Sequence, residues 1–134
     1  MKRYLVVLSV AMAALIGVGT TLSAHHSFAA TYKEDERITI QGELVQFQFR
    51  NPHSFVQVNV MEKDGTVRRY SVEWAGSANL GGTGVNQQTL KVGDKVKITG
   101  SPARSYPKVA SMRLVTLERA DGFEWGKKAG EVVD

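Results

Sequence analysis

The sequence predicts an all-β domain. Between residues 37 and 118, apolar residues recur at every second position in five short runs, which is the pattern of half-buried β-strands. Turn residues separate the runs, and Asp64-Gly65 is the clearest turn, because glycine supplies the positive φ that a tight hairpin requires. Five strands with one irregular connection favour a small Greek-key barrel of the OB type. An immunoglobulin-like sandwich is the lesser alternative, because it usually has about seven strands.

The first three strands are predicted from the N-terminal half of this region. Residues 37–49 alternate with a break in phase at Leu44-Val45, and Gly42 within the strand indicates a bulge or a sharp bend. Proline cannot donate to a strand ladder, so Asn51-Pro52 marks a turn. Residues 55–60 and 67–74 then form a hairpin around Asp64-Gly65.

The remaining chain holds two more strands. Residues 75–89 are rich in glycine and predict a flexible connection with one helical turn near residues 77–80. Residues 95–100 and 109–118 are the fourth and fifth strands, and a loop with Pro102 and Pro107 lies between them. After residue 118 the alternation fades, and we expect a polar tail in which Phe123 and Trp125 fold back.

Composition excludes several kinds of site. The 134 residues are 43% hydrophobic and 22% charged, as expected for one compact domain. The chain has no cysteine, which excludes disulfides, thiolate zinc sites and cysteine nucleophiles. The net charge of +4 falls by two if Lys2 and Arg3 are removed with a leader, so a nucleic-acid partner is not expected.

The N-terminus has the three parts of a secretory signal. Lys2-Arg3 is a short positive region, an apolar run follows to Val18, and small residues lead to Ala24. The apolar run is shorter than the roughly 20 residues of a membrane-spanning helix. We expect cleavage after Ala24, with a cut after Ala29 as the main alternative.

These patterns divide the chain into four parts. Residues 1–24 are the signal peptide, 25–36 an extended lead-in, 37–118 the OB-like barrel, and 119–134 a polar tail. The sequence thus predicts a bacterial protein of the periplasm or the cell exterior, with no membrane span in the mature chain.

Several short motifs occur together in one order: Ala24-His25-His26-Ser27-Phe28, Gly42, Asn51-Pro52-His53, Val72-Glu73, Leu90-Lys91-Val92-Gly93-Asp94 with Val96, and Gly100-Ser101-Pro102-Ala103-Arg104. Together they resemble a family of secreted bacterial proteins of uncharacterised role, domain of unknown function 6152. The resemblance covers nearly all of residues 24–118 and implies a small exported β-barrel with no established reaction. It carries over six candidate functional positions: His25, His26, Asn51, His53, Glu73 and Arg104. The chain departs from the pattern at residues 81–84, which are richer in glycine than the family pattern.

The histidines predict a transition-metal site. Imidazole suits copper, zinc and nickel, and a chain without thiolates must rely on it. Cleavage after Ala24 would give His25 a free amine next to its ring, so His25 could chelate with two nitrogens, and His53 or His26 could supply a third. Such a nitrogen set favours Cu(II) and resembles the histidine brace of copper proteins in its geometry only. The alternative is that His25 and His26 are frayed terminal residues.

His53, Glu73 and Arg104 each have a second reading. The ring of His53 could cap its turn or bind Glu73 within the barrel. Glu73 could orient a metal-ligating histidine, or it could face solvent beside Arg69. Arg104 lies between two prolines and could grip a small anionic ligand.

Two classes of function follow. The first is a non-catalytic copper-binding protein that carries or sequesters the metal through His25, His26 and His53, with Asn51 and Glu73 in support. The second is an interaction module that binds an oligosaccharide, an anionic ligand or an envelope protein. An enzyme is less favoured, because no serine, histidine and acid grouping or phosphate-binding loop is evident. A copper-dependent oxidase is the third alternative, with no substrate surface or redox partner evident in the sequence.

Overall fold

The structure is a computed structural model that describes residues 28–126. Its elements in chain order are α2 (Phe28–Thr31), β1 (Ile38–Gln48), β2 (His53–Met61), β3 (Val67–Ala75), α3 (Ser77–Gly81), β4 (Lys95–Pro102), β5 (Ser111–Arg119) and β6 (Glu124–Trp125). The hydrogen-bonded strand order is β3-β2-β1-β4-β5-β6, and β3 also pairs with β5. The expected signal peptide and the last eight residues lie outside the described part.

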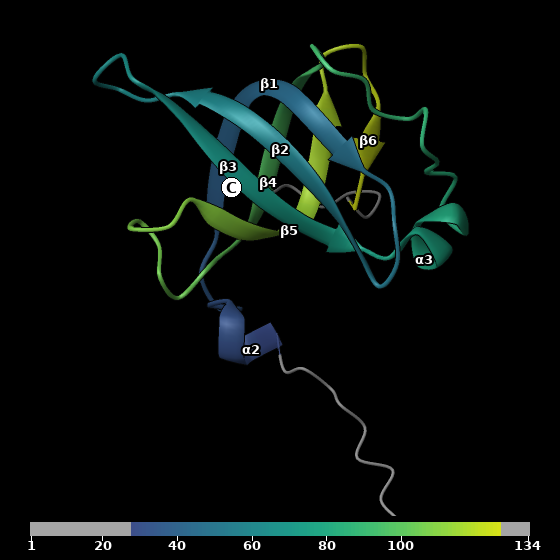
Figure 1. The fold of residues 1–134 in the computed structure, drawn as a ribbon, viewed down its shortest axis with the longest axis horizontal. Coiled ribbons are helices and arrows are strands. Elements are labelled where there is room, and N and C mark those ends of the chain that lie inside the picture. The colour runs from purple at the N-terminus through teal and green to yellow at the C-terminus, as the bar shows by residue number, and fades with distance from the viewer. Residues whose placement is uncertain (1–27, 127–134) are drawn as a thin grey trace, which may run out of the picture.

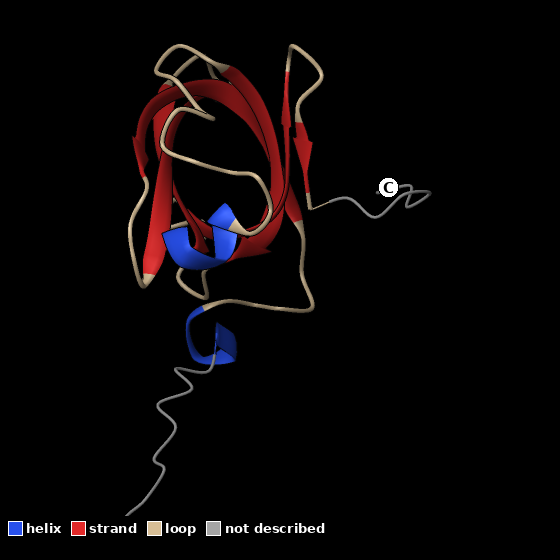
Figure 2. Ribbon diagram, turned by 90° about the vertical axis from the view of Figure 1, so that its right-hand side faces the viewer, coloured by secondary structure: helices blue, strands red, loops and turns tan. Residues whose placement is uncertain are grey.

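The first five strands form a closed barrel (Figure 1). Neighbouring strands are antiparallel except at the seam, where β3 and β5 pair in parallel over three residues, from Ser71↔Ser111 to Glu73↔Arg113. The predicted five-stranded Greek-key barrel of the OB type is therefore confirmed. Figure 2 shows the strands as a ring, and α3, the upper of the two helices, lies over the lower part of that ring.

β1 joins the two halves of the barrel by changing its partner. It pairs with β4 from Ile38 to Glu43 and with β2 from Glu43 onward. The register with β2 shifts between Leu44 and Gln46, which is the bulge indicated by the break in phase. Gly42 lies at the bend, and a Cβ placed there would be 2.1 Å from the Asn59 carbonyl oxygen, so only glycine permits this approach.

The inward side chains of all five strands make one apolar core. In β2 and β3 the buried residues alternate with partly exposed ones, as the sequence pattern predicted. The completely buried core side chains on the strands are Leu44, Val56, Val58, Val72, Ile98, Met112 and Leu117. Leu80 of α3 is also completely buried, so this short helix closes one end of the core.

The chain beyond β5 returns to the barrel. Trp125 of β6 pairs with Leu117, and its ring lies edge-on to Trp74 with the ring centroids 4.9 Å apart. Its indole N–H donates to the Thr83 hydroxyl at 3.0 Å, which ties the glycine-rich connection to β6. Phe123 and Trp125 thus fold back as expected.

The lead-in differs from the expected extended chain. Residues Phe28–Thr31 form one helical turn, and the Tyr32 amide donates to the Phe28 carbonyl at 2.7 Å. Tyr32 then pairs with Ala103 as an isolated bridge. Within residues 28–126, no helix has the length and apolar character needed to cross a membrane.

Candidate functional site

His53 is the first residue of β2 and faces away from the core. Its neighbour Ser54 is fully buried, so the alternation of the strand turns the imidazole to the outer face. Glu73 of β3 lies diagonally across the ladder, since Phe55 pairs with Glu73 and His53 with Ala75. Nδ1 of His53 is 3.0 Å from Oε1 of Glu73. This carboxylate fixes the orientation of the ring and leaves the Nε2 atom for another partner.

Glu73 also binds a residue from the lead-in. The Tyr32 hydroxyl donates to the second carboxylate oxygen, Oε2, at 2.5 Å. Tyr32 is buried, with 3% of its surface exposed, and the Glu73 side chain is 15% exposed. Burial, and then the bond to Glu73, raise the pKa of the Tyr32 hydroxyl above its usual value. One carboxylate therefore connects β3, the start of β2 and the lead-in.

We name residues 28–37 the N-terminal strap, because this segment crosses the seam between β3 and β5. At the site, the Phe28 ring lies edge-on to the His53 ring, with the centroids 5.8 Å apart. The Arg113 guanidinium of β5 lies over the Phe28 ring at 3.6 Å and is 3.1 Å from the Glu34 carboxylate. The strap is thus attached to both strands of the seam.

Arg104 holds the strap from the loop after β4. Its side-chain Nε donates to the Ala29 carbonyl at 2.7 Å, and its backbone N–H donates to the Thr31 carbonyl at 2.9 Å. Arg104 is thus engaged with the strap backbone in this structure. Its binding of an anionic ligand stays a prediction.

Asn51 connects the turn before β2 to the start of α3. Its side-chain oxygen accepts a hydrogen bond from the Ala78 amide at 3.2 Å, in the first turn of α3. A Cβ added to Gly76 would lie only 2.7 Å from this same side-chain oxygen. The turn before β2 therefore packs closely on the start of α3. Asn51 therefore fixes the turn that precedes His53, and no side-chain bond between these two residues occurs among residues 28–126.

The structure brings together only some of the residues singled out from the sequence. His53 and Glu73 are in contact, and Glu73 is paired with His53 and Tyr32, while Arg69 binds Asn59. His25 and His26 lie outside the described residues. Within residues 28–126, no three histidine or acidic side chains are grouped so that they could hold a metal ion.

Sequence reasoning missed Tyr32, Phe28 and Arg113 as parts of this site. Phe28 stands in the same motif as the two histidines, two residues after His26. Tyr32 is the one aromatic residue in the stretch of small and charged residues from 29 to 36, and that isolation was the available signal. Nothing in the spacing of Arg113 distinguishes it from other outward arginines.

The described chain resembles solved structures of single-stranded DNA-binding proteins. One crystal form of the mitochondrial single-stranded DNA-binding protein from S. cerevisiae shares 13% identity, covers 69% of this chain and 98% of its own, and has a TM-score of 0.49. A second crystal form shares 11% identity over 63% of this chain and 93% of its own, with a TM-score of 0.48.

No curated protein matches the chain. A family model does match it, from residue 12 to residue 110, which is more than half of the sequence. The predicted resemblance is thereby confirmed, and the chain belongs to the family described as a family of unknown function (DUF6152).

Proposed function

We propose that the mature protein binds a transition metal, copper in the first instance, at a site built from His53 and the processed N-terminus. The observation that carries this proposal is the bond between His53 Nδ1 and Glu73. Metal-ligating histidines commonly donate their other ring N–H to a carboxylate, which fixes the tautomer and makes the ring a stronger ligand. His53 has this arrangement, and 37% of its side chain is exposed.

The strap supports the participation of the N-terminus. Phe28 contacts the His53 ring, and His25 and His26 precede it by three and two residues. A chain spans at most about 3.6 Å per residue, so the His26 backbone lies within about 7 Å and that of His25 within about 11 Å of Phe28. The covalent tether therefore keeps both histidines within reach of His53.

Cleavage after Ala24 would complete the ligand set. The His25 amine has a low reference pKa, about 7.7–8.0, so a metal can displace its proton near neutrality. The amine and ring of His25 with the ring of His53 would supply three nitrogens, and His26 a further or alternative one. Nitrogen donors in this number suit Cu(II). We therefore propose a role in copper carriage or sequestration after export to the periplasm or the exterior.

The test begins with the protein exported by a bacterial host. Its intact mass, with and without one equivalent of Cu(II), reports the cleavage site and the metal retained. Competition titration against a chromogenic chelator then gives the affinity, and electron paramagnetic resonance reports the nitrogen ligands. We expect a chain that begins at His25, one bound copper, and an affinity at least about tenfold lower after His53→Ala or Glu73→Gln.

Two controls make the test specific. Glu43→Gln removes an exposed carboxylate whose partner is Lys95, and it should leave copper affinity unchanged. A chain with one alanine inserted before His25 keeps all three imidazoles but moves the amine, and it should bind copper more weakly. A chain that begins at Ala30, or equal affinity for the native protein and the His53→Ala variant, would contradict the proposal.

A further inference from the structure

The ladder between β1 and β2 stops halfway along β1. Its last pair is Glu43↔Asn59, whereas the ladder between β1 and β4 continues to Ile38. On the other side of the gap, β2 runs on to Met61, paired only with β3. β1 and the β2–β3 hairpin are therefore in close contact where Gly42 meets Asn59. From there toward Ile38 on β1 and Met61 on β2, the two segments separate.

The register shows which backbone groups face this gap. In an antiparallel ladder, successive residues direct their N–H and C=O groups to opposite sides. Leu44 bonds to the turn before β4, through its N–H to Asp94 and its C=O to Gly93, so Glu43 and Gln41 direct their groups toward β2. The Glu62 N–H donates to Thr66 within the hairpin, so Met61 directs its groups toward β1.

If the ladder continued past Glu43 and Asn59, Gln41 and Met61 would be its next hydrogen-bonded pair. The described ladders give neither residue a partner on that side. Each therefore presents one N–H donor and one C=O acceptor to the gap. Free strand edges of this kind readily accept another strand.

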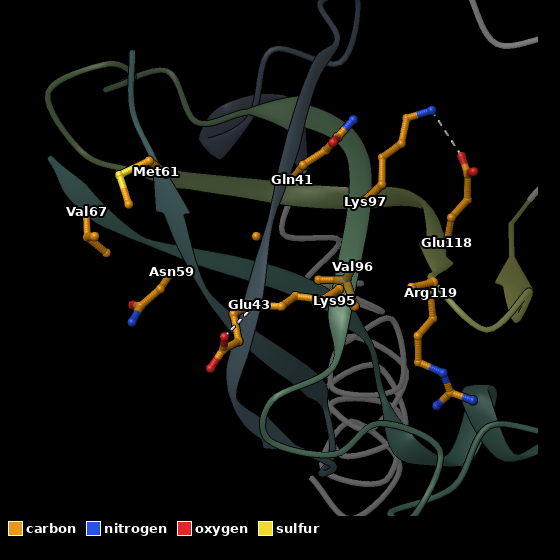
Figure 3. A pocket seen from close by; sticks show the side chains of 12 residues that line it. Gln41, Glu43, Asn59, Met61, Val67, Lys95, Val96, Lys97, Glu118 and Arg119 are labelled. Carbon is orange, nitrogen blue, oxygen red and sulfur yellow. Dashed lines mark hydrogen bonds and ion pairs between the residues drawn. The ribbon is translucent and has the colours of Figure 1, made fainter. Parts of the chain in front are cut away.

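A groove of about 680 Å³ lies over this gap. Figure 3 shows Met61 and Val67 on one side of it and Gln41 and Lys97 on the other. Met61 and Val67 are cross-strand neighbours at the hairpin end and are 66% and 59% exposed. The opposite wall is polar, with Lys95 bound to Glu43 at 2.6 Å. The volume falls within the range of about 300–1,000 Å³ that is usual for ligand sites.

We propose that this groove binds an extended peptide segment of a partner protein, which adds a strand between β1 and the β2–β3 hairpin. The free backbone groups of Gln41 and Met61 recognise peptide N–H and C=O groups, which an oligosaccharide does not offer in that spacing. Because the groove has a wall on each side, it favours a single peptide strand as its partner. The edge strand of a second folded sheet would be less favoured. Met61 and Val67 lie side by side across the hairpin and select an apolar side chain on the face of the peptide that meets them.

This proposal uses none of the residues of the proposed metal site. Its first test is amide hydrogen exchange of the native protein, followed by NMR. Because their N–H groups are unpaired, the Gln41 and Met61 amides should exchange at least about tenfold faster than those of Gly42 and Val60. Slow exchange at both Gln41 and Met61 in the monomer would show that the gap is closed and would overturn the proposal.

The second test adds a probe peptide, acetyl-Lys-Thr-Val-Thr-Val-Thr-Val-Lys-amide, at up to millimolar concentration. We expect resonance shifts centred on Gln41 and Met61, and slower exchange of both amides. The same peptide with N-methylated valines keeps the side chains but loses donors on one edge, and it should fail to protect either amide. Equal binding of the two peptides, or shifts confined to other strands, would overturn the proposal.

Two variants distinguish binding in the groove from non-specific binding to exposed apolar residues. Met61→Glu should weaken peptide binding at least about fivefold, as for a residue at the centre of an interface. Val92→Glu changes a valine that is 72% exposed and does not line the groove, and it should leave binding unchanged. Protection of Gln41 and Met61 that appears without peptide and rises with protein concentration would assign the groove to a second copy of the chain and would also overturn the proposal.

Discussion

Replacing Tyr32 with phenylalanine tests the junction between the strap and the barrel. The change removes only the hydroxyl that donates to Glu73 and keeps the buried ring. A hydrogen bond to a charged group contributes about 1.5–3 kcal/mol. Because the Glu73 side chain is 15% exposed, water can replace part of the bond. We therefore expect Tyr32→Phe to lower the free energy of unfolding by about 1.5 kcal/mol.

Urea denaturation at pH 7 gives this difference, and a double-mutant cycle isolates the pair. Glu73→Gln, Tyr32→Phe and the double variant should yield a coupling energy of about 1 kcal/mol or more. If the two changes are additive, the Tyr32–Glu73 bond contributes nothing, and the reasoning is refuted.

The pH dependence gives a second readout of the same bond. Burial, and then Glu73, raise the pKa of Tyr32, so folding favours the protonated hydroxyl. This contribution is complete below the unfolded pKa of about 10 and is lost as pH rises above it. Burial, and then Tyr106, also raise the pKa of Tyr70. Native protein should therefore lose stability above about pH 10, and Tyr32→Phe should reduce that loss without abolishing it.

Three further changes test the fold. Gly42→Ala should lower the free energy of unfolding by about 1–3 kcal/mol, because the added Cβ would lie 2.1 Å from the Asn59 carbonyl oxygen. Gly81→Ala is the matched control: its added Cβ would have no neighbour within 4 Å, so thermal melts should show a neutral or slightly stabilising effect. Leu80→Ala should cost about 2–5 kcal/mol in urea unfolding, because the side chain is completely buried. Arg104→Ala should speed limited proteolysis of the strap while the barrel's melting temperature changes by only a few degrees; unchanged proteolysis would contradict the attachment described.

The barrel was predictable because its strands alternate cleanly. Residues 55–60 and 67–74 lie within β2 and β3, and the break in phase at Leu44-Val45 coincides with the shift in register between Leu44 and Gln46. Gly42 marked the bend because a strand interior rarely tolerates glycine without a close backbone neighbour. These signals are local, so periodicity and turn chemistry were enough to find them.

The strap was not predictable in the same way. Tyr32 binds Glu73 across 41 positions of sequence, and no local pattern reports a contact of that separation. The helical turn at Phe28–Thr31 has four residues, too few for a periodic signal. β6 has two residues, and its strand character comes from pairing with β5. The sequence could therefore nominate His53 and Glu73, but it could not reveal how the lead-in is attached to them.

The strap also bears on where the predicted signal peptide could be cleaved. Cleavage after Ala24 leaves every strap contact intact. Cleavage after Ala29 would remove the Phe28 ring from between His53 and Arg113, along with the carbonyl that accepts from Arg104. A cut five residues later would thus remove the first contacts of the strap as well as discard two histidines, while Tyr32 and Glu34 would keep their bonds to the seam. Of the two predicted cleavage sites, only the one after Ala24 would leave residues 28–29 attached to the barrel.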